Sequence, residues 1–152
     1  TNYLFGGFMS LPIINVMCTG NSFRSQMAEA YLKLFAEGKA IIYSSGVKAN
    51  GKVTEEAKKL MAEEGVSLEG HSSNQVDDYL NVKFDIVLTV CDNANAKCPV
   101  FNNPVEHRLH QSFPDPEKVE GQDPEEFYNS LRPVRDAIKV YCKKLVEKYV
   151  AK

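Results

Sequence analysis

Short apolar runs alternate along the chain with longer stretches in which apolar residues recur at helical spacing. Four apolar runs predict buried strands, at residues 12–17, 40–44, 84–90 and 105–110. The helical stretches predict helices over residues 25–37, 55–64 and 125–149, and a shorter helix from Ser72 or Ser73 to about Leu80. Strands that alternate with helices are typical of parallel sheets with right-handed crossovers. The pattern therefore predicts an α/β fold, a single doubly wound domain with a small central four-stranded parallel sheet flanked by helices.

Turn residues and helical faces refine this prediction. Thr54 is expected to cap the helix over residues 55–64, and Gly65 to close it. The apolar residues expected to face the core are Met27, Ala30, Tyr31 and Leu34 in the helix over residues 25–37, and Phe127, Leu131, Val134, Ile138, Tyr141, Leu145 and Tyr149 in the last helix.

The composition is that of an ordinary globular protein, with 152 residues of which 43% are hydrophobic and 25% charged. A net charge of −2 gives no strong field, so neither nucleic acid nor a membrane surface is an expected partner. We expect a cytoplasmic monomer. Residues 1–11 lack the basic front and cleavage site of a signal peptide, and are expected to be an N-terminal extension or a cloning remnant beside a domain over residues 12–152.

The four cysteines are Cys18, Cys91, Cys98 and Cys142. An even number allows two structural disulfides, but such frameworks belong mostly to short secreted chains, so thiols kept for chemistry are favoured. Cys18 and Cys91 each follow a predicted strand, and open parallel sheets place their sites beyond the carboxyl ends of the strands. A shared site is therefore predicted there. Cys142 lies in the last helix and is expected to pack in the core.

The segment from Cys18 to Ser25 has the features of an oxyanion-binding loop. It follows a strand, turns at Gly20 and Asn21, which tolerate unusual dihedrals, and opens a helix whose N-terminal N–H groups attract anions. Arg24 offers a planar fork of donors to two oxygens of one oxyanion. A thiol in such surroundings ionises readily, so Cys18 is predicted to be a catalytic thiolate. The residues expected to bind the oxyanion are Thr19, Gly20, Asn21, Ser22, Phe23, Arg24 and Ser25.

The run Cys-Thr-Gly-Asn-Ser-Phe-Arg-Ser-Gln-Met-Ala-Glu that starts at Cys18 resembles the opening of the low-molecular-weight protein tyrosine phosphatase superfamily. Within it, the chain is most similar to the thioredoxin-coupled arsenate reductases. The likeness extends from about Pro12 to the end and includes Tyr43-Ser44-Ser45-Gly46, His71-Ser72-Ser73 and Asp115-Pro116. Phe23 departs from the smaller residue common at its position, and its side chain is expected to crowd the mouth of the loop.

The resemblance gives Cys91 and Cys98 a role, because the similar arsenate reductases carry such a pair whereas the phosphatases have no use for one. It implies that Cys18 forms an adduct with arsenate, that Cys91 attacks Cys18 to release arsenite, and that Cys98 then attacks Cys91. The resulting Cys91–Cys98 disulfide would be reduced by thioredoxin, so no cofactor is expected. The six residues between the pair are expected to form a helical turn in the reduced state and an exposed loop after oxidation.

Asp115 stands in a polar loop, where an Asp-Pro pair is usually only a turn. The resemblance implies that Asp115 is the general acid that protonates the oxygen leaving as Cys18 attacks. The phosphatases follow this pair with aromatic residues that stack on a phosphotyrosine ring, whereas Glu117-Lys118-Val119-Glu120 follows it here. Arsenate is therefore the expected substrate, with phosphate or sulfate as competing oxyanions.

Asn21, Ser44 and His71 are either residues that brace the loop or ordinary turn and cap residues. Some members of the superfamily hold a structural cation near residues that match Asn21, Glu29 and Ser44. Asn74 stands where a carboxylate would complete that site, so no bound metal is predicted.

Three alternatives remain open. A phosphotyrosine or aryl phosphatase would share the loop and the acid, with Cys91 and Cys98 as bystanders. A redox- or oxyanion-sensing module would bind the anion without turnover. A zinc site of Cys91, Cys98, His107 and His110 is the third, although its spacing fits no usual zinc finger.

Overall fold

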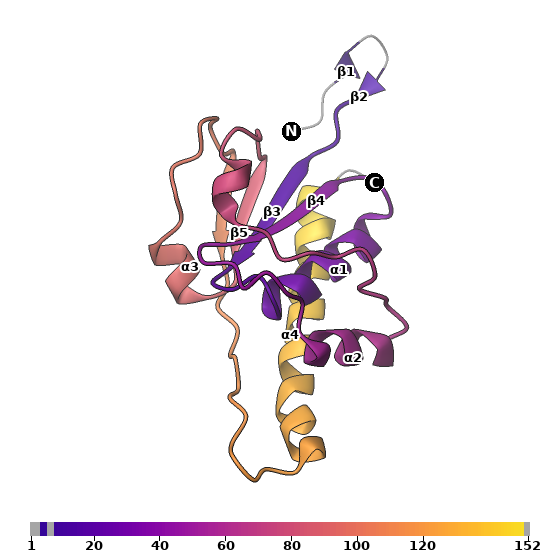
Figure 1. Cartoon of the computed structure of the whole chain (residues 1–152). Coiled ribbons are helices and arrows are strands. Elements are labelled where there is room, and N and C mark those ends of the chain that lie inside the picture. The colour runs from indigo at the N-terminus through magenta and orange to yellow at the C-terminus, as the bar shows by residue number, and fades with distance from the viewer. Residues whose placement is uncertain (1–3, 6–7, 151–152) are drawn as a thin grey trace.

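The central sheet has four parallel strands in the order β4-β3-β5-β6 (Figure 1). The strands are β3 (Ile13–Cys18), β4 (Ile41–Gly46), β5 (Ile86–Thr89) and β6 (His107–His110). This computed structural model describes residues 4–5 and 8–150. The fold class predicted from the sequence is confirmed, and each predicted strand is present with shifted ends.

The helices are α1 (Arg24–Ala36), α2 (Glu55–Glu63), α3 (Asp92–Ala96) and α4 (Pro124–Tyr149), with a 3₁₀ helix η1 (Val76–Tyr79). Helices α1 and α4 pack against each other (Figure 1). Because side chains alternate between the faces of a strand, Ser44 meets Glu29 of α1 while Tyr43 faces the other way, toward Tyr79 of η1. The sheet is therefore covered on both faces.

The predicted core faces are mostly confirmed. Thr54 caps α2 by accepting a hydrogen bond from the Ala57 N–H, as predicted. Leu34 is a wrong prediction, since it is 49% exposed. Helix α1 lies between the sheet and α4, so most of its surface is buried. The part of the helix that carries Lys33 and Leu34 faces solvent.

Helix α4 buries Phe127, Leu131, Val134, Ile138 and Leu145, while Tyr141 and Tyr149 are half-buried at its edge. Cys142 is 1% exposed, and its thiol donates to the Ala28 carbonyl oxygen at 3.7 Å. Burial raises the pKa of this thiol, which suits a packing role.

The prediction that Ser72 or Ser73 caps a short helix is wrong. The helix η1 begins at Val76 after an extended Gln75, and Gln75 pairs with Gly46, the last residue of β4. The polar groups of residues 72–75 are engaged elsewhere, because the Ser73 hydroxyl donates to the Gly20 carbonyl oxygen. Residues 72–75 are therefore extended, because they bond to the loop after β3, and the helix begins only at Val76.

The N-terminal segment contributes a separate antiparallel pair, β1 (Leu4–Phe5) and β2 (Phe8–Met9), outside the four-stranded sheet. Residues 1–3 and 6–7 lie outside the described residues, so the origin assigned to residues 1–11 stays a prediction. Within residues 4–5 and 8–150, none of the helices combines the length and apolar character that crossing a membrane requires.

Candidate active site

The two central strands deliver two cysteines to one edge of the sheet. Strand β3 ends at Cys18, and its neighbour β5 ends two residues before Cys91, with Met17 in register with Thr89. The Thr19 hydroxyl oxygen lies 3.3 Å from the Cys91 sulfur and joins the two segments. The prediction that Cys18 and Cys91 share this edge is confirmed.

The Cys18 sulfur is held by the loop that follows it. The Asn21 N–H donates to Cys18 Sγ at 3.1 Å, and Ser25 Oγ lies 2.9 Å from the same sulfur. The Asn21 side-chain amide donates to Ser25 Oγ at 2.7 Å, which leaves the Ser25 proton for the sulfur. Asn21 adopts φ 51°, the left-handed conformation expected of it. The loop thus directs two donors at Cys18.

Two close approaches explain glycines in and beside the loop. A Cβ on Gly46 would lie 2.5 Å from the Thr19 carbonyl oxygen, and one on Gly20 would lie 2.6 Å from Asn50 Nδ2. Asn50 also donates its side-chain amide to Ser22 Oγ at 3.0 Å and its N–H to the Gly20 carbonyl oxygen at 2.8 Å. Asn50 was missed in the sequence because it belongs to a distant polar turn.

Arg24 opens α1 and reaches the loop that carries the predicted acid. It donates to the Phe113 carbonyl oxygen at 2.8 Å, and its guanidinium lies 3.6 Å from the Asp115 carboxylate. The Asp115 side chain is 57% exposed, so it is open to solvent at the rim. In the part of the chain that the structure describes, no side chain caps the start of α1 at Phe23, and its first N–H groups stay available for an anion.

A hollow of about 230 Å³ lies over Cys18, between the loop and Asp115. Of the predicted oxyanion-binding residues, five line it: Thr19, Gly20, Ser22, Phe23 and Arg24. Asn21 and Ser25 are fully buried and brace the loop from behind. A larger hollow of about 610 Å³ lies beside α2 and residues 65–71, and none of the predicted catalytic residues lines it.

Phe23 is 9% exposed and belongs to the hydrophobic core cluster, with part of its side chain at the mouth. It also lines an adjoining hollow of about 150 Å³ together with Phe127 and Leu131. The expected crowding by Phe23 is therefore limited, because most of its side chain is buried in the core.

Cys91 caps the short helix α3, and the Ala94 N–H donates to its sulfur at 3.4 Å. The predicted helical turn between the two cysteines is confirmed, with all four thiols free. Cys98 is half-buried after the end of α3, with its sulfur 3.9 Å from Met17 Sδ and 3.7 Å from Arg108 Nη1. Exposure after oxidation stays a prediction.

A buried chain of hydrogen bonds supports the loop from α1. Gln26 donates to the Asn21 carbonyl oxygen at 2.9 Å, and its amide oxygen lies 2.9 Å from His71 Nδ1. Burial lowers the pKa of His71, while the nearby Glu29 opposes that shift. Gln26 was missed from the sequence, because a polar residue in a helix gives no signal of a buried partner.

The residues that match the superfamily's cation site do not fit a bound cation. The Glu29 carboxylate already accepts hydrogen bonds from Ser44 Oγ and Lys33 Nζ, each at 2.5 Å. The Asn21 side-chain oxygen accepts the Asn74 N–H. The positive charge beside Glu29 is supplied by Lys33.

The zinc alternative finds no support either. His107 packs against the Tyr149 ring, and His110 contacts Thr89 and Asp92. Over the described ranges, 4–5 and 8–150, no three side chains of histidine, cysteine, aspartate or glutamate form a group that could hold a metal.

A thiol at the end of a central parallel strand, set in a loop that leads into a helix N-terminus, defines a class of cysteine-dependent oxyanion-binding α/β proteins. Residues 13–152 match the model of the low molecular weight phosphotyrosine protein phosphatase family, and the chain belongs to that family.

The proteins similar to this chain include arsenate reductases, and a phosphatase shares its fold. The chain is 41% identical over 130 residues to an arsenate reductase of Halalkalibacterium halodurans, covering 86% of this chain and 91% of that protein. A solved arsenate reductase in the reduced state is 28% identical with a TM-score of 0.67, covering 91% of this chain and 98% of the other. A tyrosine phosphatase of Erwinia amylovora shares the fold, with a TM-score of 0.73, 24% identity and full coverage of both chains.

Proposed function

We propose that this protein reduces arsenate to arsenite through Cys18, Cys91 and Cys98, with thioredoxin as the electron donor in the cytoplasm. The observation that carries the proposal is the position of the Cys91 thiol beside the oxyanion loop. Cys91 Sγ lies 3.3 Å from the hydroxyl of Thr19, the residue directly after Cys18 in the oxyanion loop. A phosphatase needs no thiol there, and the similarity to arsenate reductases supports the same function.

In the first step the loop N–H groups and Arg24 bind arsenate, and the Cys18 thiolate attacks arsenic. Asp115, at the rim beside Arg24, protonates the oxygen that leaves. The Cys91 thiolate then attacks the Cys18 sulfur. The electron pair of the sulfur–arsenic bond stays with arsenic, which leaves as arsenite, and a Cys18–Cys91 disulfide forms. Two thiols are oxidised as As(V) becomes As(III).

In the second step the Cys98 thiolate attacks the Cys91 sulfur. A Cys91–Cys98 bond forms, and Cys18 leaves as a thiolate into the hydrogen bonds of Asn21 and Ser25. The dithiol of thioredoxin reduces the new disulfide by the same exchange chemistry. Electrons pass only through sulfur, so the scheme uses no organic cofactor and no metal.

Phosphate ester hydrolysis is the second candidate function, because Cys18, Arg24 and Asp115 are arranged for it equally well. The charged residues that follow Pro116 offer no aromatic wall for a phosphotyrosine ring. We therefore expect weak phosphatase activity on small aryl phosphates beside the reductase activity.

The test is arsenite formation with thioredoxin, thioredoxin reductase and NADPH. Wild type and the matched control Cys142→Ala should turn over many times. Cys98→Ser should form one arsenite per chain and stop, and Cys91→Ser should form none. Continued turnover by Cys98→Ser, or ester hydrolysis by wild type without any arsenite, would contradict the proposal.

A further inference from the structure

The exposed face of β6 contacts both ends of the segment between the paired cysteines. Arg108 and His110 are two residues apart and so point to the same face of the strand. His110 Nε2 lies 2.9 Å from the Asp92 carboxylate at the start of α3, and Arg108 Nη1 lies 3.7 Å from Cys98 Sγ after its end.

The Arg108 guanidinium is held beside Cys98 by an aromatic ring. It lies over Phe101, with 5.8 Å from its central carbon to the ring centroid. Phe101 is itself fixed, since it is 6% exposed and packs edge-on against Phe84 at 5.4 Å. Because the Phe101 ring is fixed, the Arg108 guanidinium that stacks on it moves away from the Cys98 sulfur less readily than a surface arginine without such a contact.

Cys91 has a separate set of contacts. The Ala94 N–H donates to its sulfur from α3, and the Thr19 hydroxyl lies at 3.3 Å. In contrast, the contacts that the structure gives to the Cys98 sulfur are with Met17 and Arg108, of which only Arg108 carries a charge.

We infer that Arg108 is a positioning residue for the second thiol exchange, where its guanidinium stabilises the Cys98 thiolate that attacks Cys91. The inference rests on the proposed function for its place in the reaction. The exchange it assists breaks the Cys18–Cys91 bond, forms the Cys91–Cys98 bond and leaves the electron pair on Cys18, with no net change in oxidation state. Stabilisation of the attacking thiolate raises the fraction of Cys98 that can react.

The first arm of the test uses the reduced full-length protein without arsenate. Differential labelling with light and heavy iodoacetamide and mass spectrometry of the Cys98 peptide gives the alkylation rate of this thiol. Arg108→Gln should slow it roughly threefold, the size expected for one exposed charge contact. Arg108→Lys should restore most of the rate. Lys97→Gln, which removes an equal charge next to Cys98 in sequence, is the matched control and should change it little.

The second arm follows one turnover with arsenate by rapid quench and disulfide mapping. Arg108→Gln should release arsenite and form Cys18–Cys91 at the wild-type rate, and should form Cys91–Cys98 roughly threefold more slowly. A merely structural role would loosen α3 and slow the first disulfide as well.

Three results would overturn the inference: unchanged alkylation of Cys98 in Arg108→Gln, equal slowing by Lys97→Gln, or equal slowing of both disulfides. A failure of wild type to form arsenite would instead refute the proposed function, and the alkylation arm would still decide whether Arg108 acts on Cys98.

Discussion

The environment of a single sulfur atom decides what this site can do. Cys18 is 3% exposed, yet its sulfur receives the Asn21 N–H and the Ser25 hydroxyl in a loop that leads into a helix N-terminus. Hydrogen bonds to a charged group contribute more than those between neutral groups, because the charge strengthens each of them. The loop therefore offers the Cys18 sulfur two hydrogen-bond donors, which the proposed scheme uses when Cys18 attacks the oxyanion and again when it leaves the disulfide.

Ser25→Ala should reduce the rate of the first step, since it removes the hydroxyl donor from the Cys18 thiolate without adding bulk. We expect a loss of roughly tenfold in single-turnover arsenite release, the lower end of what one hydrogen bond to a charged group contributes. Rapid-quench measurement at saturating arsenate checks this. Ser67→Ala, on an exposed turn away from the site, is the control. Equal rates for Ser25→Ala and wild type would show that the hydroxyl does not assist Cys18.

The residues around Cys18 also show what a sequence can and cannot predict. Asn21, Arg24 and Ser25 lie within one strand–loop–helix unit, so their roles follow from short-range spacing. Asn50 and Ser73 contact the same loop from segments about thirty and fifty residues further along the chain. Only the folded chain brings them there. Asn50 stands in no pattern that marks it, and the run His71-Ser72-Ser73 gives no signal that Ser73 contacts this loop.

At the scale of elements, α3 is short and depends on its neighbours. A helix of five residues has little stability of its own, because forming the first turn is costly. Its first residue, Asp92, contacts His110 of β6, and Asn93 donates to the Thr19 hydroxyl at 2.9 Å. These contacts hold α3 between the oxyanion loop and β6 while the thiols are free.

His110→Ala should loosen α3 in the reduced protein. Removal of the imidazole breaks the side-chain contacts of His110 with Asp92 and Thr89, while the backbone pairing of β6 with β5 stays in place. We expect a protease of low specificity to cut residues 92–97 several times faster than in wild type, as mapped by mass spectrometry. His107→Ala is the matched control, since His107 lies on the same strand but packs against Tyr149.

Wild type should show the same increase in cutting once the Cys91–Cys98 disulfide has formed. Equal cutting of wild type in both redox states would contradict the opening of this segment on oxidation. Unchanged cutting of reduced His110→Ala would show that His110 does not hold α3.

The elements differ in how well the sequence predicted them. Helix α4 was predicted to within one residue, because its long amphipathic pattern outweighs local detail. The short helix expected from Ser72 or Ser73 was wrong, since the segment's polar groups bond to the loop after β3 instead. Tertiary contacts decide the conformation of such short segments, and the pattern of apolar and polar residues does not predict those contacts.

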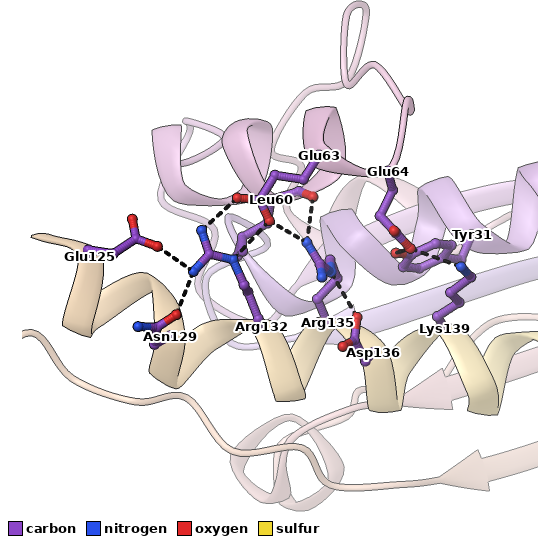
Figure 2. A network of polar contacts seen from close by, with 10 residues as sticks. All are labelled: Tyr31, Leu60, Glu63, Glu64, Glu125, Asn129, Arg132, Arg135, Asp136 and Lys139. Carbon is purple, nitrogen blue, oxygen red and sulfur yellow. Dashed lines mark hydrogen bonds and ion pairs between the residues drawn. The ribbon is translucent and has the colours of Figure 1, made fainter.

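At the scale of the whole molecule, ion pairs join the end of α2 to α4, and a hydrogen bond joins it to α1 (Figure 2). Glu63 of α2 pairs with Arg132 and Arg135 of α4 at 2.7 Å each, and Glu64 pairs with Lys139 at 2.9 Å. Tyr31 of α1 donates to Glu64 at 3.0 Å. These contacts hold α2 against α1 and α4.

The position of α2 matters for the site because its cap residue touches the oxyanion loop. The Thr54 N–H and hydroxyl both donate to the Ser22 carbonyl oxygen, at 2.9 and 3.2 Å. Contacts between α2 and α4 therefore support the loop that surrounds Cys18, although they lie outside the hollow above it.

Glu63→Gln should lower stability and flatten its dependence on acid pH. Hydrogen bonds from Arg132, aided by Arg135, hold the pKa of Glu63 at about 2, below its usual value of 4.5. Between these values the unfolded chain binds the proton more readily than the native one, so the stabilisation from Glu63 is full above about pH 4.5 and is lost as the pH falls toward 2. Because the carboxylate is partly exposed, we expect a loss of roughly 1 kcal/mol at pH 7.

Urea unfolding between pH 7 and pH 2.5, followed by circular dichroism, measures this effect. The difference in unfolding free energy between wild type and Glu63→Gln should shrink as the pH falls through that window, because protonation removes from wild type the same charge that the substitution removes. Glu147→Gln, an exposed carboxylate on α4, serves as the control and should leave the profile nearly unchanged. A constant difference at every pH would mean that Glu63 stabilises the protein by packing rather than by its charge. It would contradict the view that the ion pairs of Glu63 with Arg132 and Arg135 hold α2 on α4.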